Sequence, residues 1–415
     1  ILFGHSPDFI SNAAKAQIDR GVETGPQSPL AGEVAELVCG LTGSERCTFA
    51  CTGSEANVGA LRVARTVTGR TKVVAFEGAY HGIHDEVVMR AGKNHQALPA
   101  APGIPREATS NMILLPWGEQ SSLDEISKLG DELAAVLVEP VQSRKPQFHS
   151  KEYIQEIRKI TEQNGVALIL DEVVTGFRVG PGGIRKRFDI DADMTTYGKV
   201  VGGGYPIGII AGKAKFLDAM DGGQWQYGDD SIPEQGVTFF AGTFVRHPLA
   251  LAVSKAVLTK IKEEGDELYT ALEKKTTAMA EDAKAFIKQM KADVSFEEFA
   301  SLFYISVPSS AQWGHLLFLS MVFDGIHIQQ YRPNFLTTEH TEEDVQRILK
   351  SFKSALANLV VNGLLEGDQV AAKKYLNSNG SIPPGARLGK NEHGEPAYFI
   401  EDPDNKGAFL EVGRP

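Results

Sequence analysis

Residues 167–199 constrain the fold of this chain more than any other segment. Val166 to Leu170 form an apolar run that is typical of a buried strand in a parallel sheet. Asp171 follows the run directly, and a carboxylate at the carboxyl end of such a strand lies where open α/β sheets bind their ligands. A second segment, Asp193 to Gly198, leads to Lys199. The sequence therefore predicts a carboxylate and an amine at one edge of a sheet.

Asp171 and Lys199 allow more than one interpretation. An aspartate after a strand is often a helix cap or a turn residue, and most lysines are solvated. Held in one pocket, however, the lysine could form a Schiff base with an aldehyde cofactor, while the aspartate pairs with a protonated ring nitrogen. Pyridoxal phosphate chemistry requires this combination. The pair becomes specific only if elements for the phosphate and the ring occur elsewhere in the chain.

The segment Thr52-Gly53-Ser54-Glu55 is a candidate phosphate site. It follows a short predicted strand, Cys47 to Ala50, and opens a helix with small and apolar residues on one side. We expect Ser54 to cap this helix, which leaves the first backbone N–H groups facing an anion. A capped helix that binds nothing explains the same pattern equally well.

Two further predicted strands end in polar residues. Lys72 to Phe76 leads to Tyr80 and His81, and Leu133 to Val138 ends at Glu139. An aromatic side chain at such a position can stack on a planar ring, although a packing tyrosine and a structural histidine are the ordinary alternatives. Strands that alternate with helical segments predict an α/β fold with a doubly wound, mostly parallel sheet and a site along one edge.

The composition changes after the helical pattern that begins at Leu249. We expect strands at Leu302–Val307 and Leu316–Phe323, and a final helix after Thr341, in a smaller α+β unit. The tract Gln224 to His247 is irregular, which predicts a loop that covers a site or reaches a neighbouring subunit. The expected organisation is an N-terminal segment that belongs to the small domain or a dimer contact (1–30), a large domain (31–255), a small domain (256–365) and a polar tail or linker (366–415).

Composition excludes several classes of function. The 415 residues carry a net charge of −11 without a long basic run, which argues against a nucleic-acid surface. No apolar segment approaches the roughly 20 residues that span a bilayer, and no signal peptide is evident, so we expect a cytoplasmic protein. Cys39, Cys47 and Cys51 suggest neither a disulfide framework nor a metal site. The opening ILFGHSPDFI lacks a starting Met and suggests a fragment of a longer chain.

Taken together, the motifs resemble the class III, fold-type I pyridoxal phosphate-dependent aminotransferases, and in particular the glutamate-1-semialdehyde aminomutase-like members. The resemblance runs from about Gly4 to the helix after Thr341. It implies a large domain with a mostly parallel sheet flanked by helices, and a smaller α+β domain. The motifs that carry it are Thr52-Gly53-Ser54-Glu55-Ala56, Tyr80-His81-Gly82, Val138-Glu139-Pro140, Asp171 to Arg178, Gly198 to Gly204 and Gly242-Thr243.

The resemblance implies two catalytic residues. Lys199 would form the Schiff base with pyridoxal 5′-phosphate and move the proton between substrate and cofactor, and Asp171 would keep the ring nitrogen protonated. It also implies cofactor-binding positions around them: Gly53 and Ser54 at the phosphate, Tyr80 and Val173 on the two faces of the ring, His81 and Glu139 beside it, with the role of Glu139 left open, and Thr243 reaching the partner's cofactor in a homodimer.

Two positions depart from the family pattern. Val174 stands where many members have a glutamine that holds the cofactor's phenolic oxygen. No residue matches the arginine that many members use for the substrate carboxylate; Arg332 is a candidate, and a surface arginine is the simpler interpretation. The weak arginine signal suggests an acceptor substrate without a free carboxylate near its carbonyl group.

The segment Gly236 to Pro248, the opening residues and the tail GARLGKNEHGEPAYFIEDPD also resemble aminotransferase domains of hybrid polyketide synthase–nonribosomal peptide synthetases. This implies transfer of an amine from an amino acid donor to a 3-oxoacyl thioester on the phosphopantetheine arm of an acyl carrier protein. The alternatives are an aminomutase or aminotransferase that acts on a free small molecule, and a non-catalytic scaffold domain.

Overall fold

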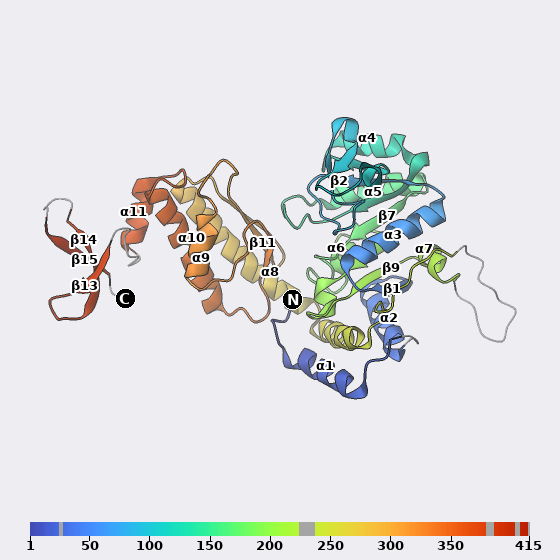
Figure 1. Cartoon of the computed structure of the whole chain (residues 1–415), viewed down its shortest axis with the longest axis horizontal. Coiled ribbons are helices and arrows are strands. Elements are labelled where there is room, and N and C mark those ends of the chain that lie inside the picture. The colour runs from blue at the N-terminus through green and yellow to red at the C-terminus, as the bar shows by residue number, and fades with distance from the viewer. Residues whose placement is uncertain (25–27, 224–236, 379–385, 403–406, 414–415) are drawn as a thin grey trace. The chain divides into compact units, whose positions relative to one another are not determined.

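The computed structural model of the chain describes residues 1–24, 28–223, 237–378, 386–402 and 407–413 (Figure 1). Contacts between residues divide it into two compact units. The first unit comprises Ile1–Lys274 with the short segments Phe299–Ser301 and Leu336–Glu339. The second comprises Lys275–Glu298, Leu302–Phe335 and His340–Pro415.

The first unit is built on a seven-stranded mixed sheet. Only β9 runs antiparallel to its neighbours, so the other six strands all end at the same edge of the sheet. The strands predicted at Lys72 to Phe76 and Leu133 to Val138 have these bounds, and the strand predicted at Val166 to Leu170 begins and ends one residue later than expected. In spatial order the strands are β1 (Arg46–Ala50), β9 (Gly208–Gly212), β8 (Met194–Tyr197), β7 (Ala167–Asp171), β6 (Leu133–Val138), β2 (Lys72–Phe76) and β5 (Met112–Leu115).

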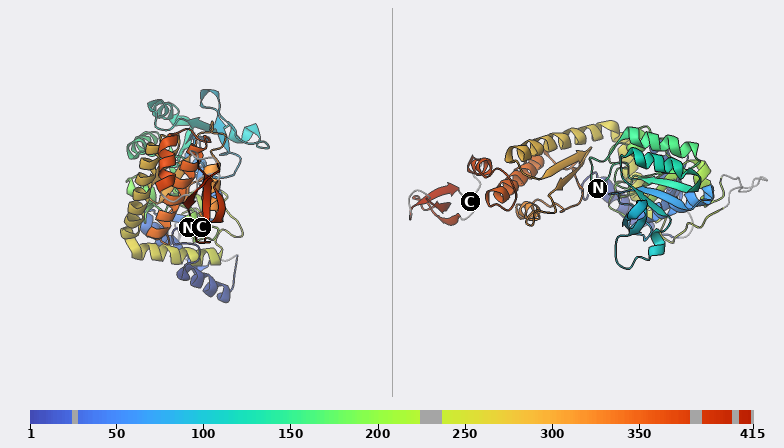
Figure 2. Two further views of the ribbon diagram at one scale, coloured as in Figure 1. Left: turned by 90° about the vertical axis from the view of Figure 1, so that its left-hand side faces the viewer. Right: turned by 90° about the horizontal axis from the view of Figure 1, so that it is seen from above.

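Alternate residues of the central strands contribute to two different hydrophobic cores. In β7, Ala167 and Ile169 pack in the core that holds α3 (Gly53–Thr68), while Leu168 and Leu170 pack on the opposite face with α5 (Lys151–Gln163). Both faces are covered by helices, as the view from above shows (Figure 2). This explains why the strands are uninterrupted apolar runs: successive side chains point to opposite faces, and both faces are buried.

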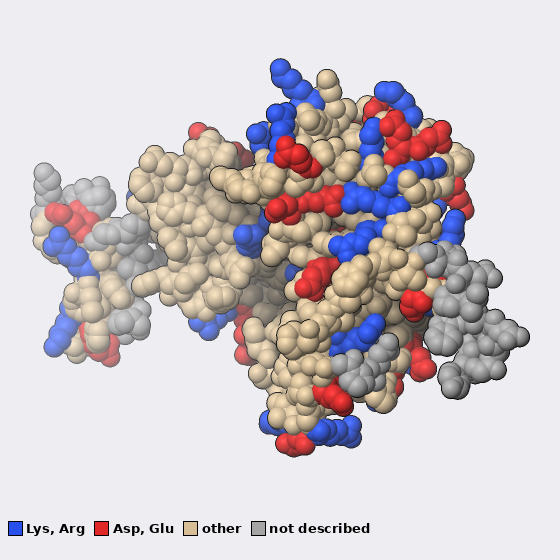
Figure 3. Space-filling model, turned by 45° about the vertical axis from the view of Figure 1, so that its right-hand side comes forward, with Lys and Arg blue, Asp and Glu red and all other residues tan. Residues whose placement is uncertain are grey.

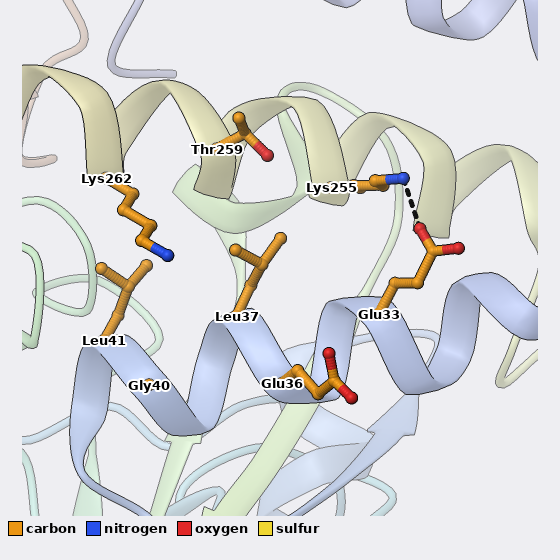
Figure 4. A pocket seen from close by; sticks show the side chains of 8 residues that line it. All are labelled: Glu33, Glu36, Leu37, Gly40, Leu41, Lys255, Thr259 and Lys262. Carbon is orange, nitrogen blue, oxygen red and sulfur yellow. Dashed lines mark ion pairs between the residues drawn. The ribbon is translucent and has the colours of Figure 1, made fainter.

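A third core lies under the antiparallel side of the sheet. It joins α1 (Asp8–Arg20), α2 (Pro29–Thr42) and the first part of α8 (Pro248–Met290) to β9 and the turn after β8. A shallow groove runs between α2 and α8, where Lys255 pairs with Glu33 (Figure 4). The remaining elements of this unit are β3 (Met89–Ala91), β4 (Ala97–Pro99), α4 (Gln120–Lys128), α6 (Gly183–Arg187) and α7 (Ala214–Leu217).

The second unit contains the end of α8 and the elements that follow it. Gly265, in the part of α8 that belongs to the first unit, interrupts the helix with a φ of 61° and a ψ of −149°. The helix expected after Thr341 is α10 (Glu342–Val361), which begins with a capping box formed by Thr341 and Asp344. The other elements are β10 (Ser295–Phe299, of which the last residue belongs to the first unit), β11 (Leu302–Ser306), α9 (Leu316–Phe323), β12 (Asn334–Phe335), α11 (Gln369–Ser378) and the antiparallel strands β13 (Arg387–Lys390), β14 (Pro396–Glu401) and β15 (Phe409–Gly413).

One sequence prediction about this region was wrong. The run Leu316–Phe323 is helix α9 and not a strand. Seven of these eight residues are apolar, so the run carries no clear periodicity that separates the two structures, and the buried residues Leu317, Phe318 and Met321 follow helical spacing. The expected polar tail contains helix α11 and a three-stranded sheet.

Residues 224–236 of the predicted loop lie outside the described residues, and the rest of that loop, 237–247, contains neither helix nor strand.

Charged side chains of both signs are interspersed on the surface. On the face shown in Figure 3, lysines and arginines lie among aspartates and glutamates over the first unit. Within the described ranges, no helix combines the length and apolar character needed to cross a membrane, and no group of three or more His, Cys, Asp or Glu residues could hold a metal ion.

Candidate active site

The carboxyl ends of the parallel strands and the connection between β8 and β9 form one pocket of about 400 Å³. Because β9 is antiparallel to β8, the chain leaves β8 and re-enters the sheet at the same edge. Both ends of this connection therefore reach the pocket. The lining residues are Cys51 to Ser54, Asn57, Tyr80 to Gly82, Asp171, Val173, Val174, Lys199 and Tyr205 to Ile207.

Asp171 is a buried carboxylate held by three donors. His81 Nδ1 lies 2.7 Å from Oδ2, Asn57 Nδ2 donates to the same oxygen at 2.8 Å, and the Val173 N–H donates to Oδ1 at 3.1 Å. Burial by itself would raise the pKa of Asp171, but the hydrogen bond and charge of His81, together with the two other donors, hold that pKa below its ordinary value. Asp171 therefore presents a negative charge to the pocket at neutral pH.

Asn57 links this carboxylate to the next strand. Its Oδ1 accepts a hydrogen bond from Thr196 Oγ1 at 2.7 Å, and its Nδ2 also donates to the His81 carbonyl at 2.9 Å. Asn57 is 1% exposed on a face of α3 otherwise made of small apolar residues. The sequence analysis did not identify it. The available signal was a polar residue on the apolar face of a helix, which must find a partner once it is buried.

Lys199 begins a short 3₁₀ turn that is separated from β8 by Gly198 alone. Its φ of 46° lies in the left-handed region, which is uncommon for a residue with a side chain and is often found at functional sites. Lys199 is an exposed residue that lines the pocket. Partial desolvation of the amine lowers the pKa of Lys199, and the charges of Asp171 and Glu139 oppose the shift. The neutral amine is thus easier to form than in a solvated lysine.

Glu139 lies behind the pocket and fixes the loop that carries Tyr80. Its Oε2 accepts the Tyr80 backbone N–H at 2.9 Å, and its Oε1 accepts the Ser143 N–H at 3.0 Å. The side chain is buried, and burial followed by the charge of Asp171 raises the pKa of Glu139. Glu139 therefore acts on the pocket through backbone positions, without lining it.

The N-terminus of α3 opens toward the pocket, with a cap different from the one expected. Thr52, and not Ser54, is the N-cap, and it forms a capping box with Glu55. Ser54 Oγ instead accepts the Ile83 N–H at 3.2 Å. The backbone is packed too closely here for larger residues: a Cβ on Gly53 would lie 2.7 Å from both γ-carbons of Val173, and one on Gly82 would lie 2.4 Å from Ser54 Oγ.

Most of the residues singled out from the sequence meet in this pocket. Gly53, Ser54, Tyr80, His81, Asp171, Val173 and Lys199 line it, and so does Val174. Two do not. Thr243 is exposed and is not among the lining residues, and Arg332 is an exposed residue of the second unit whose carbonyl accepts the Asn334 amide at 3.0 Å.

Arg144 is a charged residue near the pocket that the sequence analysis missed. Its guanidinium carbon lies over the Tyr80 ring, 4.8 Å from the ring centroid. Arg144 comes five residues after Glu139, in a loop without helix or strand, where no periodicity predicts which way a side chain points. A contact of this kind depends on two loops meeting in space.

Comparison with known proteins identifies relatives over most of the chain. Residues 1–294 match the family model of class III aminotransferases. Glutamate-1-semialdehyde 2,1-aminomutase of Archaeoglobus fulgidus is 32% identical over 375 residues, which cover 86% of this chain and 86% of that protein. The enzyme of the same name from Desulfitobacterium hafniense strain Y51 is 32% identical over 378 residues, which cover 86% of this chain and 85% of the relative.

Solved structures show the same fold. A transaminase with pyridoxal phosphate bound superimposes with a TM-score of 0.78 at 25% identity, covering 87% of this chain and 85% of the other. A β-phenylalanine aminotransferase from Variovorax paradoxus superimposes with a TM-score of 0.74 at 27% identity, covering 88% of this chain and 82% of its own.

Proposed function

Because the chain belongs to the class III aminotransferase family and its cofactor is pyridoxal 5′-phosphate, we propose that Lys199 and Asp171 are the catalytic residues of an amine transfer in the pocket described above. The bound cofactor supplies an electron sink that acidifies the hydrogen on the substrate carbon bearing the amine. The observation that carries the proposal is the meeting of an ionised, buried carboxylate and an amine with a lowered pKa in one pocket.

The residues of the pocket fit this cofactor. The Asp171 carboxylate can pair with a protonated ring nitrogen because its pKa stays low despite burial. Tyr80 and Val173 supply an aromatic and an aliphatic wall for a flat ring. At Gly53 and Ser54, the first turn of α3 offers backbone N–H groups to a phosphate, in a place where a Cβ on Gly53 would collide with Val173.

Lys199 would hold and move the proton. Its lowered pKa raises the fraction of neutral amine, which is the form that can accept a proton from a substrate carbon. Asp171 keeps its charge because His81 and Asn57 donate hydrogen bonds to it, so it would not take up the proton that Lys199 moves. Glu139 would hold Tyr80 in place through the backbone.

For the substrate, the first candidate is a free small molecule of the glutamate-1-semialdehyde type. The curated relatives with this name cover 86% of the chain at 32% identity, which supports an aminomutase or an aminotransferase of this kind. An aminomutase moves the amine within one molecule and therefore requires no external donor.

The second candidate is a 3-oxoacyl thioester on the phosphopantetheine arm of an acyl carrier protein, with an amino acid as donor. It is supported by the sequence resemblance of residues 236–248 and of the tail, and by the apolar side chain of Ile83, which follows the lining residue Gly82 and is 77% exposed. An acyl chain leaving the pocket past Gly82 would contact this side chain. We include a homodimer in both candidates, with exposed Thr243 reaching the partner's cofactor.

Mass spectrometry of two reactions tests the proposal and separates the candidates. The cofactor-loaded protein is incubated with glutamate-1-semialdehyde alone, and with a carrier-bound 3-oxoacyl thioester in the presence of single amino acids. Isomerisation without a donor supports the first candidate. Donor-dependent replacement of the ketone oxygen by an amine supports the second. A protein that binds the cofactor yet changes neither substrate, nor any amino acid donor, contradicts the proposed amine transfer.

A further inference from the structure

We infer that Arg144 is the residue that binds the carboxylate of the amino acid substrate. The inference rests on the proposed function, because it assigns a second part of the same site. The guanidinium of Arg144 lies over the Tyr80 ring, and Tyr80 lines the pocket that contains Lys199 and Asp171. The position is at the rim, because Arg144 is exposed and is not itself a lining residue.

The loop that carries Arg144 is held against the Tyr80 loop at two further points. Glu139 accepts the N–H groups of both Tyr80 and Ser143, and Gln142 Nε2 donates to the Glu77 carbonyl at 2.8 Å. Gly78, with a φ of 86°, leaves room for the Gln142 amide, since a Cβ there would lie 2.7 Å from Oε1. The backbone under Arg144 is therefore fixed relative to the pocket wall.

The charges of the pocket call for such a residue. Among its described lining residues, Asp171 is negative, Lys199 is the only lysine, and there is no arginine. Lys199 is committed to the cofactor, and the phosphate of the cofactor adds further negative charge. An amino acid substrate would bring its own carboxylate into this environment, and it requires a cation that the lining residues do not supply.

Arg144 has the chemistry for this contact. A guanidinium that stacks on an aromatic ring keeps its N–H groups in its own plane, where they remain available to a carboxylate in a bidentate pair. No ion pair between Arg144 and an acidic side chain occurs in the described part of the chain. The residue is thus a positioned cation with free donors at the rim of the pocket.

The test compares Arg144→Gln with the wild type and with Lys145→Gln. Lys145 is the matched control because it is the neighbouring exposed cation of the same loop, but its amine lies over Phe148, 5.0 Å from the ring centroid. Single-turnover changes in the visible absorption of the bound cofactor give the half-saturation and the limiting rate for the best amino acid substrate and for its carboxamide. Calorimetry gives the affinity for the matching 2-oxo acid, and absorption titration gives the affinity for the cofactor.

We expect Arg144→Gln to raise the half-saturating concentration of the amino acid and to weaken the affinity for the 2-oxo acid, each by about 10- to 100-fold. This is the size of effect expected from the loss of a charge-assisted bidentate pair. The limiting rate, the cofactor affinity and the half-saturation for the carboxamide should stay within about twofold. Arg144→Lys should recover part of the loss, and Lys145→Gln should match the wild type.

Three results would overturn the inference. One is an unchanged affinity of Arg144→Gln for the 2-oxo acid. Another is a weakened affinity for the cofactor together with an unchanged affinity for the 2-oxo acid, which would mean that Arg144 only supports Tyr80. The third is an equal loss in Lys145→Gln, which would show a general effect of surface charge. If the wild type itself reacts with no amino acid, the proposed amine transfer fails. The calorimetric affinities for the 2-oxo acid then still test whether Arg144 binds a carboxylate.

Discussion

His81 Nδ1 lies 2.7 Å from Asp171 Oδ2, with both side chains at least 96% buried. An ionised carboxylate can only accept hydrogen bonds, so Nδ1 is the donor. This contact is the largest of the effects that oppose burial at Asp171 and keep its pKa below the ordinary value. The charge that we assign to cofactor binding is therefore maintained from a neighbouring loop.

Replacing His81 by Leu should raise the pKa of Asp171, because the variant loses both the hydrogen bond and the charge of His81 that oppose the effect of burial. A depressed pKa supports the charged form down to low pH, so the variant should lose activity and cofactor affinity at a higher pH than the wild type as the solution is acidified. The acid limb of the profile of kcat/KM against pH measures this shift. An acid limb that stays in place would contradict the assigned role of His81.

Replacing Lys199 by Ala should abolish turnover, with a loss of at least about 10³-fold, because both the covalent attachment and the proton carrier disappear. The variant should still bind the cofactor noncovalently through Asp171 and the N-terminus of α3. Absorption spectroscopy and equilibrium dialysis measure binding, and the amine-transfer assay measures turnover. Lys213→Ala, which removes a lysine paired with Asp191 and Asp193, is the control. Normal turnover by Lys199→Ala would contradict the catalytic assignment.

Gly53→Ala should destabilise the cofactor-free protein by about 1–3 kcal/mol, because the added Cβ would lie 2.7 Å from both γ-carbons of Val173. Adding Val173→Ala to the same chain removes both γ-carbons and should recover much of this loss. Urea unfolding of the two single variants and the double variant measures the coupling. Gly40→Ala, at a position with open space around it, is the control. Strictly additive effects would show that Val173 does not limit the space at Gly53.

Glu172 should make stability depend on pH near neutrality. Burial outweighs its hydrogen bonds to Arg185, Ile184 and Thr175 and raises its pKa from 4.5 to about 7. Because this pKa is raised in the folded protein, the contribution of Glu172 to the free energy of unfolding is fully present below about pH 4.5. It is lost as the pH rises through about 7, a change of roughly 3 kcal/mol.

Denaturant unfolding of the wild type and Glu172→Gln across this range tests the effect. The stability of the wild type relative to the variant should fall as the pH rises from about 4.5 to 7. Glu156→Gln, at an exposed position on α5, controls for the loss of a surface charge. A constant difference between wild type and Glu172→Gln would show that the carboxyl titrates in the folded protein as it does in the unfolded one.

The sequence was most informative where both faces of an element are buried. Uninterrupted apolar runs identified the strands that end at Phe76 and Val138, and Asp171 followed from the end of such a run, whereas Lys199 was predicted from the mixed apolar and polar segment Asp193 to Gly198. It was less informative where two neighbouring residues could each play the same local role. Thr52 and Ser54 are both good helix caps, and only the packing of Gly53 against Val173 and of Ser54 against the Ile83 backbone determines which one caps α3.

Partners that lie far apart in the chain could not be paired from the sequence. Asn57 reaches Asp171 across 114 positions of the chain, and Arg144 lies over a ring 64 positions before it (144 − 80). Neither position follows from periodicity or spacing, because each depends on the order of strands in the sheet.

The reversed direction of β9 determines where this protein tolerates added sequence. The connection from Gly198 to Ile207 leaves and re-enters the sheet at the pocket edge, so an insertion there would displace Lys199 or Tyr205 directly. Crossover turns at the opposite edge, such as the one at Gly165 with open space around it, are the places where a tag or a fused domain could be introduced without disturbing the chemistry.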